Sequence, residues 1–304
     1  MGLVFLLYAL AASTMTMQKC AVFYFHPLII LAIRSLAGGT ILFILHRLMH
    51  GSNPLRLLAR HPFSIFKLAL LVTVTSPVIK VALLRVMTSV KVGFFYFIDP
   101  IFTVFLVYCL YGTRIRFKQF IGILVASGGI LIVLLEKGGS EGLMLIGRFS
   151  WAEALLVFAY VANRYGWLRI QEFVRSTGCG AKELNSVMML VGGLITVCAI
   201  PFFAPLPAPS EWYYGGKFLI GLVLITNVIG YTLCTYLYRF YSATFMSLAS
   251  LTRPLWIAVF GVLFLHETLS WTFALAVLFV LIGLSIFYFD ELRTLRVKAK
   301  RESV

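Results

Sequence analysis

The run Leu28–Met49 reads LIILAIRSLAGGTILFILHRLM, which is long and apolar enough to cross the roughly 30 Å hydrocarbon core of a bilayer as one helix. Comparable apolar runs recur along the chain, separated by clusters such as Gly51-Ser52-Asn53-Pro54 that cannot continue a helix. We therefore predict an all-α polytopic membrane protein with about ten transmembrane helices. The expected spans are Gly2–Phe23, Leu28–Met49, Ser64–Arg85, Ser89–Tyr111, Phe120–Leu135, Trp151–Leu168, Leu184–Phe203, Lys217–Tyr238, Ala243–Leu265 and Trp271–Phe289.

The composition excludes most soluble classes of protein. Of the 304 residues, 61% are hydrophobic and 12% are charged, whereas a soluble domain has about 45–50% apolar and about a quarter charged residues. The formal net charge of +15 could indicate a nucleic-acid partner. However, the basic residues form short clusters between apolar runs, which is typical of membrane loops and not of a nucleic-acid surface. We expect a lipid bilayer around the chain and no nucleic acid.

The basic residues also predict the orientation. Loops that hold basic clusters lie on the cytoplasmic side of a membrane protein. We therefore expect both termini in the cytoplasm, and the lack of an organelle-targeting leader favours a bacterial inner membrane. The expected inner loops contain Arg47, Arg56, Arg60, Arg114, Arg116, Lys118, Arg169, Arg175, Lys182 and Arg239, whereas the expected outer loops keep mainly Lys137, Arg148 and Lys217.

An internal repeat appears when the sequence is shifted by 154 positions (100 + 154 = 254). Such a match predicts two copies of one unit, at 1–138 and 149–290, followed by a basic tail at 291–304. Each copy has five expected spans, so the second copy enters the membrane inverted, as in many secondary transporters. The shift aligns Pro100 with Pro254, Gly38-Gly39 with Gly192-Gly193, Arg85 with Arg239, Gly129 with Gly283 and Glu136 with Asp290.

The two stretches 84–136 and 238–290 resemble the EamA repeat of the drug/metabolite transporter superfamily. The resemblance is carried by Asp99-Pro100 and Gly128-Gly129 in the first stretch, and by Arg253-Pro254 and His266-Glu267 in the second. It covers nearly the whole chain and implies ten helices, with the fifth and tenth peripheral and the others around a central cavity. It also implies carriers of amino acids, nucleotide-linked compounds and other small metabolites.

This sequence departs from the family pattern at one position. The acidic residue near the end of the fourth helix of each repeat is present as Glu267, but the equivalent position in the first repeat is Thr113. We expect Glu267 to be a structural cap or hinge before the final span, which would begin at Ser270 and Trp271.

Ionisable residues within spans are costly and usually face a cavity or a partner. Asp99 and Arg253 occupy equivalent repeat positions, directly before Pro100 and Pro254. Because proline interrupts a helix, and irregular backbone at membrane depth is tolerated beside a polar cavity, we expect both residues there. The acid would bind an ammonium or sulfonium group and the guanidinium a carboxylate or phosphate. The alternative is a gating salt bridge between Asp99 and Arg253.

Other candidates surround these two. Lys80 follows the Ser76-Pro77 kink and is expected to contact an anionic group. Arg34 is expected either in the site or in an ion pair with Glu153, and Gly38-Gly39 and Gly192-Gly193 are expected to allow close helix packing. Lys91 and Arg164 are expected to extend to the headgroups. Tyr96, Tyr231 and Trp256 are candidates for stacking on a ring or cation, and Asn163 is either a tie between helices or a cavity donor.

The predicted function is a secondary transporter or exchanger of a small polar, zwitterionic metabolite, such as an amino acid or S-adenosylmethionine, working by alternating access. A carrier of phosphorylated anions or nucleotide sugars is the alternative within transport, and a membrane scaffold or membrane enzyme is the alternative outside it. The stretch HETLS at 266–270 lacks the second histidine of a zinc motif. We expect no enzyme activity, no catalytic residue, no metal and no cofactor. A coupling ion (H+ or Na+) or a counter-substrate is expected, in a monomer or homodimer.

Overall fold

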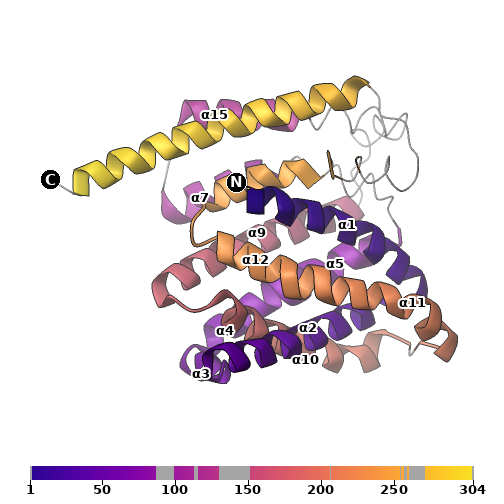
Figure 1. Ribbon diagram of the computed structural model, residues 1–304. Helices are drawn as coiled ribbons and strands as arrows, with labels where there is room; N and C mark the ends of the chain where they lie inside the picture. The colour runs from indigo at the N-terminus through magenta and orange to yellow at the C-terminus, as the bar shows by residue number, and fades with distance from the viewer. Residues whose placement is uncertain are drawn as a thin grey trace.

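The computed structural model describes residues 2–86, 99–112, 116–129, 151–205, 207–253, 255–256, 259 and 271–302. All regular secondary structure in these residues is helical. The helices lie roughly side by side and cross the molecule in the same general direction (Figure 1). The prediction of an all-α protein is confirmed.

The helices follow the predicted spans. Every predicted span overlaps helical residues of the described part, and several helices are long and apolar enough to cross a membrane, among them Pro27–His50 and Ala181–Phe203. The chain is thus a multi-pass membrane protein. In the first half the elements are α1 (Gly2–Tyr24), α2 (Pro27–His50), α3 (Leu55–Arg60), α4 (Pro62–Leu68), the π-helix η1 (Ala69–Thr75), α5 (Ser76–Leu83), α7 (Asp99–Tyr111) and a helix at 117–129. In the second half they are α9 (Trp151–Thr177), α10 (Ala181–Phe203), α11 (Pro209–Gly221), the π-helix η3 (Leu222–Gly230), α12 (Tyr231–Leu237), α13 (Ala243–Ala249), the 3-10 turn η4 (Ser250–Thr252) and α15 (Trp271–Glu302).

The ends of α2 show how the sequence sets helix boundaries. Pro27 occupies the first helical position, where its missing N–H is not needed and its fixed φ suits a helix. At the other end Gly51 adopts φ +65°, and its N–H donates to the carbonyl of Arg47 at 2.9 Å. Because most residues disfavour positive φ, glycine stops the helix there.

Helices α2 and α10 pack closely through their glycine pairs, as predicted. A Cβ atom at Gly39 would lie 3.0 Å from the backbone nitrogen of Leu190, and one at Gly193 would lie 2.7 Å from Leu36 Cδ2. These positions therefore leave no room for a larger side chain. As residue numbers rise along α2 they fall along α10, so the two helices run antiparallel where they cross (Figure 1).

Adding 154 to a residue number in the first half gives the equivalent residue in the second half, and contacts between the halves occur in equivalent pairs. Gly39 contacts Leu190, and Gly193 contacts Leu36. Gly193 is the equivalent of Gly39 (39 + 154 = 193), and Leu190 is the equivalent of Leu36 (36 + 154 = 190). Gly38 likewise packs on Asn227, and its equivalent Gly192 packs on Thr73, which is the equivalent of Asn227.

The π-helices follow the same relationship. Shifting η1 (Ala69–Thr75) by 154 gives 223–229, which falls inside η3 (Leu222–Gly230).

At the edge of the molecule, helix 117–129 packs on α15 through Gly122 and Gly283 (Figure 1). These two helices correspond to the fifth and tenth spans, which were expected at the periphery.

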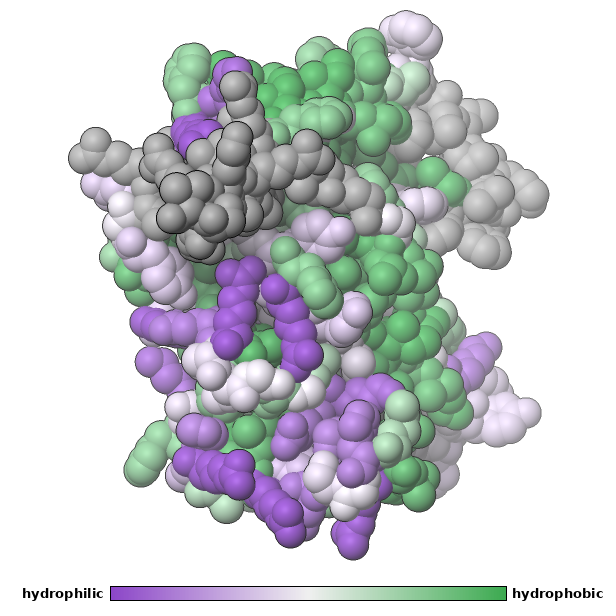
Figure 2. All heavy atoms as spheres, turned by 60° about the vertical axis from the view of Figure 1, so that its left-hand side comes forward, coloured by the Kyte–Doolittle hydropathy of each residue, from purple (hydrophilic) through white to green (hydrophobic). Residues whose placement is uncertain are grey.

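The outer surface suits a bilayer. Large apolar side chains are widely exposed, among them Phe23 (76%) and Phe202 (81%). A soluble protein, in contrast, rarely exposes broad apolar surface. Figure 2 shows hydrophilic side chains gathered on part of one face, beside a broad apolar area. This distribution is that of a protein whose flanks contact lipid and whose loops contact water.

Candidate functional site

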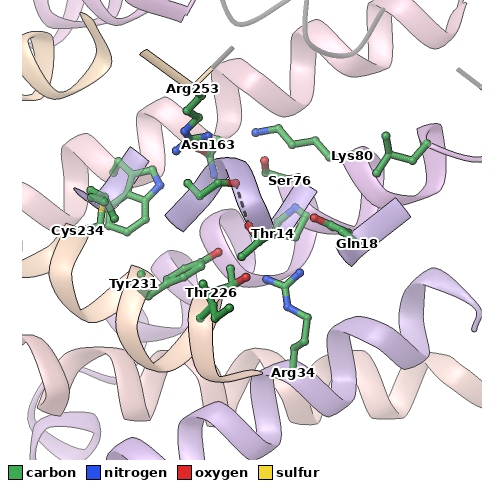
Figure 3. A pocket seen from close by; sticks show the side chains of 17 residues that line it. Thr14, Gln18, Arg34, Ser76, Lys80, Asn163, Thr226, Tyr231, Cys234 and Arg253 are labelled. Carbon is green, nitrogen blue, oxygen red and sulfur yellow. Dashed lines mark hydrogen bonds between the residues drawn. The ribbon is translucent and has the colours of Figure 1, made fainter. Parts of the chain in front are cut away.

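A cavity of about 180 Å³ lies among α1, α2, α5, α9 and the η3–α12 segment (Figure 3). It is smaller than the roughly 300–1,000 Å³ of typical ligand pockets. Its charged and polar lining residues are Thr14, Gln18, Arg34, Ser76, Lys80, Asn163, Thr226, Tyr231 and Arg253. Five of the predicted site residues (Arg34, Lys80, Asn163, Tyr231 and Arg253) are thus brought together, and Pro77 also lines the cavity.

Arg34 enters the cavity from α2, with 4% of the residue exposed. Its Nε donates to Oδ1 of Asn227 at 3.0 Å. Asn227 reaches α2 because it packs on Gly38, one helical turn after Arg34. The hydrogen-bond partner shown for Arg34 is therefore an amide, which leaves its positive charge uncompensated by that bond. Arg34 thus lines the cavity, and the hydrogen bond that it makes there goes to Asn227.

Lys80 and Arg253 approach the cavity from sides different from that of Arg34 (Figure 3). Lys80 Nζ lies 4.1 Å from the ring centre of Tyr160, and Arg253 Cζ lies 5.1 Å from that of Tyr8. Aromatic faces stabilise a cation without neutralising it. The described lining residues include these three cations, and cationic side chains suit an anionic group of a ligand.

The sequence prediction missed a group of aromatic side chains beside the cavity, Trp167 with Tyr231 and Tyr238, which we call the aromatic wall. Trp167 lines the cavity one turn after Asn163 on the same face of α9. Its ring centre lies 5.6 Å from that of Tyr231 and 5.3 Å from that of Tyr238, with which it stacks. Trp167 could have been predicted from its position, because it follows the polar residue Asn163 by one helical turn. Thr14 and Gln18, one turn apart in the first span, are a second missed set of the same kind.

The two π-helices supply irregular backbone beside the cavity. Ser76 and Pro77 directly follow η1, and Thr226 lies within η3. The hydroxyls of Ser76 and Thr226 are buried and have no hydrogen-bond partner among the described residues. Since an unsatisfied buried hydroxyl is costly, both are available to a ligand or water. Short π-helical segments recur at functional sites.

Asp99 does not line the cavity in this structure. It is 1% exposed, and both of its carboxylate oxygens are bound by Arg164. Ser250 Oγ donates to Asp99 Oδ2 at 3.2 Å, and Arg164 also reaches the Tyr238 hydroxyl at 3.5 Å. The prediction that Arg164 extends to the headgroups is wrong, because Arg164 is 7% exposed and paired within the protein. The partner of Asp99 in this structure is Arg164 and not Arg253.

The ion pair lies among further hydrogen bonds that join neighbouring helices. The hydroxyl of Tyr8 donates to the carbonyl of Met246, which joins α1 to α13. Gln171 Nε2 donates to the carbonyl of Tyr241 at 2.7 Å, which joins α9 to the segment before α13. We call Tyr8, Asp99, Arg164, Tyr238 and Ser250 the closing cluster. It lies toward the end of the molecule where α1 begins.

The remaining predicted residues have different outcomes. Pro100 is the second residue of α7 and is buried. Glu153 is 2% exposed near the start of α9, and Trp256 is half-buried against the apolar core, but neither is among the cavity-lining residues. The predictions for Tyr96, Lys91, Pro254 and Glu267 lie outside the described residues.

The model of the EamA-like transporter family matches twice, at residues 1–135 and 143–289. This chain belongs to the EamA-like transporter family. It is therefore a membrane transporter and not an enzyme, and the predicted resemblance is confirmed.

Named relatives of this EamA-like transporter align with it over most of both chains. A protein of Chlamydia muridarum (strain MoPn / Nigg) is 25% identical over 96% of this chain and 92% of the relative. A protein of Chlamydia trachomatis serovar L2 is 26% identical over 96% of this chain and 89% of the relative. Both are named S-adenosylmethionine/S-adenosylhomocysteine transporter. One solved crystal structure aligns over 93% of this chain and 94% of that chain, with a TM-score of 0.69 and 16% identity, which shows a shared fold.

Proposed function

We propose that this EamA-like transporter is a secondary transporter or exchanger of S-adenosylmethionine and S-adenosylhomocysteine. The names of the two chlamydial relatives support this substrate class. The observation that carries the proposal is a buried cavity that combines cations with aromatic rings, because both ligands carry a carboxylate and an adenine ring.

The lining residues suit the two ends of such a ligand. Arg34 and Arg253 would bind the carboxylate, as guanidinium groups do in charge-assisted pairs. Trp167 and Tyr231 would contact the adenine ring, since aromatic side chains stack on flat rings. The buried hydroxyls of Ser76 and Thr226 would hydrogen-bond to ribose or amine groups. In this assignment Asp99 acts through Arg164 and not by binding the ligand.

The proposed architecture is two inverted five-helix halves, at 1–138 and 149–290, in a bacterial inner membrane with both termini cytoplasmic. Three observations support it: the contacts that exchange under the shift of 154, the antiparallel crossing of α2 and α10, and the π-helices at equivalent positions. Inverted halves have two near-equivalent packings, and switching between them exposes a central site to each side in turn. Transport would be driven by a counter-substrate or by H+ or Na+, in a monomer or homodimer.

The closing cluster is the proposed gate of this cycle. The cavity is too small for a nucleoside-linked amino acid, so the surrounding helices must move apart to admit one. Opening toward the end where α1 begins would separate α7 from α9, which the Asp99–Arg164 pair joins. The gating salt bridge expected between Asp99 and Arg253 is not the pair in this structure, and the proposed gate is the Asp99–Arg164 pair instead.

Direct binding tests the substrate class. Purified protein in detergent would be titrated with radiolabelled S-adenosylmethionine, with and without excess unlabelled S-adenosylhomocysteine. We expect saturable binding that the homocysteine form displaces, and binding at least tenfold weaker in Arg34→Gln. Absence of saturable binding to folded protein would contradict the proposal.

The cationic lining also favours a second candidate, a carrier of phosphorylated anions or nucleotide sugars. The three lining cations would suit a phosphate group as well as a carboxylate. A competition panel distinguishes the two. If a nucleotide sugar displaces the label and S-adenosylhomocysteine does not, the second candidate is correct.

A further inference from the structure

A second hollow, with a volume of about 710 Å³, lies where the start of α1, the end of α2, the start of α10 and the end of α12 meet. We call it the α1–α12 groove. Its lining residues are Leu3, Leu6, His46, His50, Ser52, Gly180, Ala181, Lys182, Glu183, Val228, Ile229, Thr232, Leu233 and Tyr236. None of these residues lines the cavity described above.

The groove has two chemically different parts. Its flanks are apolar side chains of α1, η3 and α12, and Leu3 and Ile229 remain about half exposed. Its polar part is built from the loop-proximal ends of α2 and α10, including Lys182 and His50. Helix ends mark the level at which a span leaves the hydrocarbon. The groove therefore joins an acyl-chain environment to a headgroup environment.

Two buried polar atoms at the groove have no partner among the described residues. His46 is 5% exposed, and its Nε2 contacts Ser52 Oγ at 2.9 Å, but its Nδ1 makes no hydrogen bond. The hydroxyl of Thr232 is also without a partner. When Nε2 accepts from Ser52, Nδ1 carries the proton and can donate. Both residues line the groove, and each keeps a polar atom that no described residue uses.

The charges of the groove favour a phosphate as that acceptor. The first N–H groups of α10 have no intrahelical partner, and the helix dipole makes this end positive. Lys182 Nζ contacts only a weak acceptor, the Met49 sulfur, at 2.9 Å among the described residues. Glu183 is the acidic residue of the described lining, and its carboxylate accepts from the Gly180 N–H at 3.4 Å. That carboxylate is turned back to its own helix end.

We propose that the α1–α12 groove binds a membrane phospholipid. Its phosphate would lie at Lys182, His50, His46 and the start of α10, and an acyl chain would lie along Leu3, Leu6 and Ile229. The apolar flanks distinguish a lipid from free phosphate. The site does not depend on which metabolite the transporter carries.

Native mass spectrometry of detergent-purified protein tests this site, with dioleoyl-phosphatidylglycerol as the probe. The variant Lys182→Ala/His50→Ala removes two groove residues, and Arg56→Ala/Arg60→Ala is the matched control with two exposed cations outside the groove. We expect the groove variant to bind the first lipid about tenfold more weakly and the control to bind as wild type does. Equal binding by both variants would overturn the site.

A second arm separates lipid from free phosphate. Inorganic phosphate in large excess should leave the bound lipid in place; displacement of the lipid would assign the groove to free phosphate and overturn the proposal. If the double variant does not fold, Thr232→Val keeps the side-chain shape and removes the hydroxyl. It should weaken lipid binding several-fold, and unchanged binding would also count against the site.

Discussion

Arg164 on α9 and Asp99 on α7 form a buried ion pair in which two guanidinium nitrogens bind the two carboxylate oxygens. Ser250 adds a hydrogen bond to the same carboxylate at 3.2 Å. The pair thereby ties α7, α9 and η4 together beside the cavity. Breaking one partner of a buried pair leaves the other uncompensated and costs about 3–5 kcal/mol.

The first prediction concerns Asp99→Asn. Because Asp99 binds Arg164 and not the ligand, the change should weaken transport of S-adenosylmethionine and S-adenosylhomocysteine to a similar degree and lower the unfolding temperature. Initial rates for both ligands in proteoliposomes measure this. A selective loss of the sulfonium ligand, with the unfolding temperature unchanged, would instead place Asp99 in direct contact with substrate.

The second prediction concerns the cations of the cavity. Arg253→Gln should raise KM for S-adenosylhomocysteine at least tenfold, because a carboxylate loses a charge-assisted partner worth about 1.5–3 kcal/mol. The exposed Arg56 outside the cavity is the control. Arg56→Gln should leave KM within about twofold of wild type, and an equal effect of both changes would exclude a specific role for Arg253.

The third prediction concerns helix packing. A Cβ at Gly193 would lie 2.7 Å from Leu36, whereas Gly216 in α11 has no neighbouring atom within 4 Å of such a Cβ. Gly193→Ala should therefore destabilise the protein by about 1–3 kcal/mol through overpacking. Gly216→Ala should be neutral or slightly stabilising. Unfolding temperatures in detergent give the comparison, and a tolerated Gly193→Ala would show that α2 and α10 can separate freely.

The fourth prediction concerns pH and His26, which lies between α1 and α2. Burial, and to a lesser extent the charge of Arg85, lowers the pKa of His26 below its ordinary value. A lowered pKa means that folding favours the neutral form, so this contribution to stability is present above pH about 6.5 and is lost as the pH falls below it. The neutral ring is also needed to accept from the Leu28 N–H at 3.4 Å.

We expect the unfolding temperature of the wild type to fall between pH 7.5 and 5.5 by more than that of His26→Asn. Asparagine can cap the helix without titrating in this range. Parallel pH profiles of the two proteins would contradict this role for His26.

The sequence alone predicted the helices of the described residues, because apolar run length and proline or glycine breaks are local signals. It also predicted Arg34, Lys80, Asn163, Tyr231 and Arg253 at the cavity, because polar residues in apolar spans rarely face lipid. The pairing of Asp99 with Arg164 could not be predicted. Several spans carry a cation that could pair with Asp99 in an all-helical fold. The rotation of each helix about its axis decides which of them does, and the sequence does not give that rotation.

The π-helices and the aromatic wall escaped prediction for related reasons. A π-helical turn depends on how a span packs against its neighbours, and ALLVTVT at 69–75 has no composition that distinguishes it from an α-helix. Trp167 resembles a lipid-facing aromatic residue until Asn163, one turn away, is placed in the cavity.

Counterflow in proteoliposomes tests the proposed transport most directly. Vesicles loaded with unlabelled S-adenosylhomocysteine are diluted into labelled S-adenosylmethionine at a trace concentration. We predict transient accumulation of label above the equilibrium level, abolished in Arg34→Gln and retained in Arg56→Gln. Accumulation no greater in loaded than in empty vesicles, with protein shown to be folded and inserted, would contradict exchange of these metabolites through the cavity.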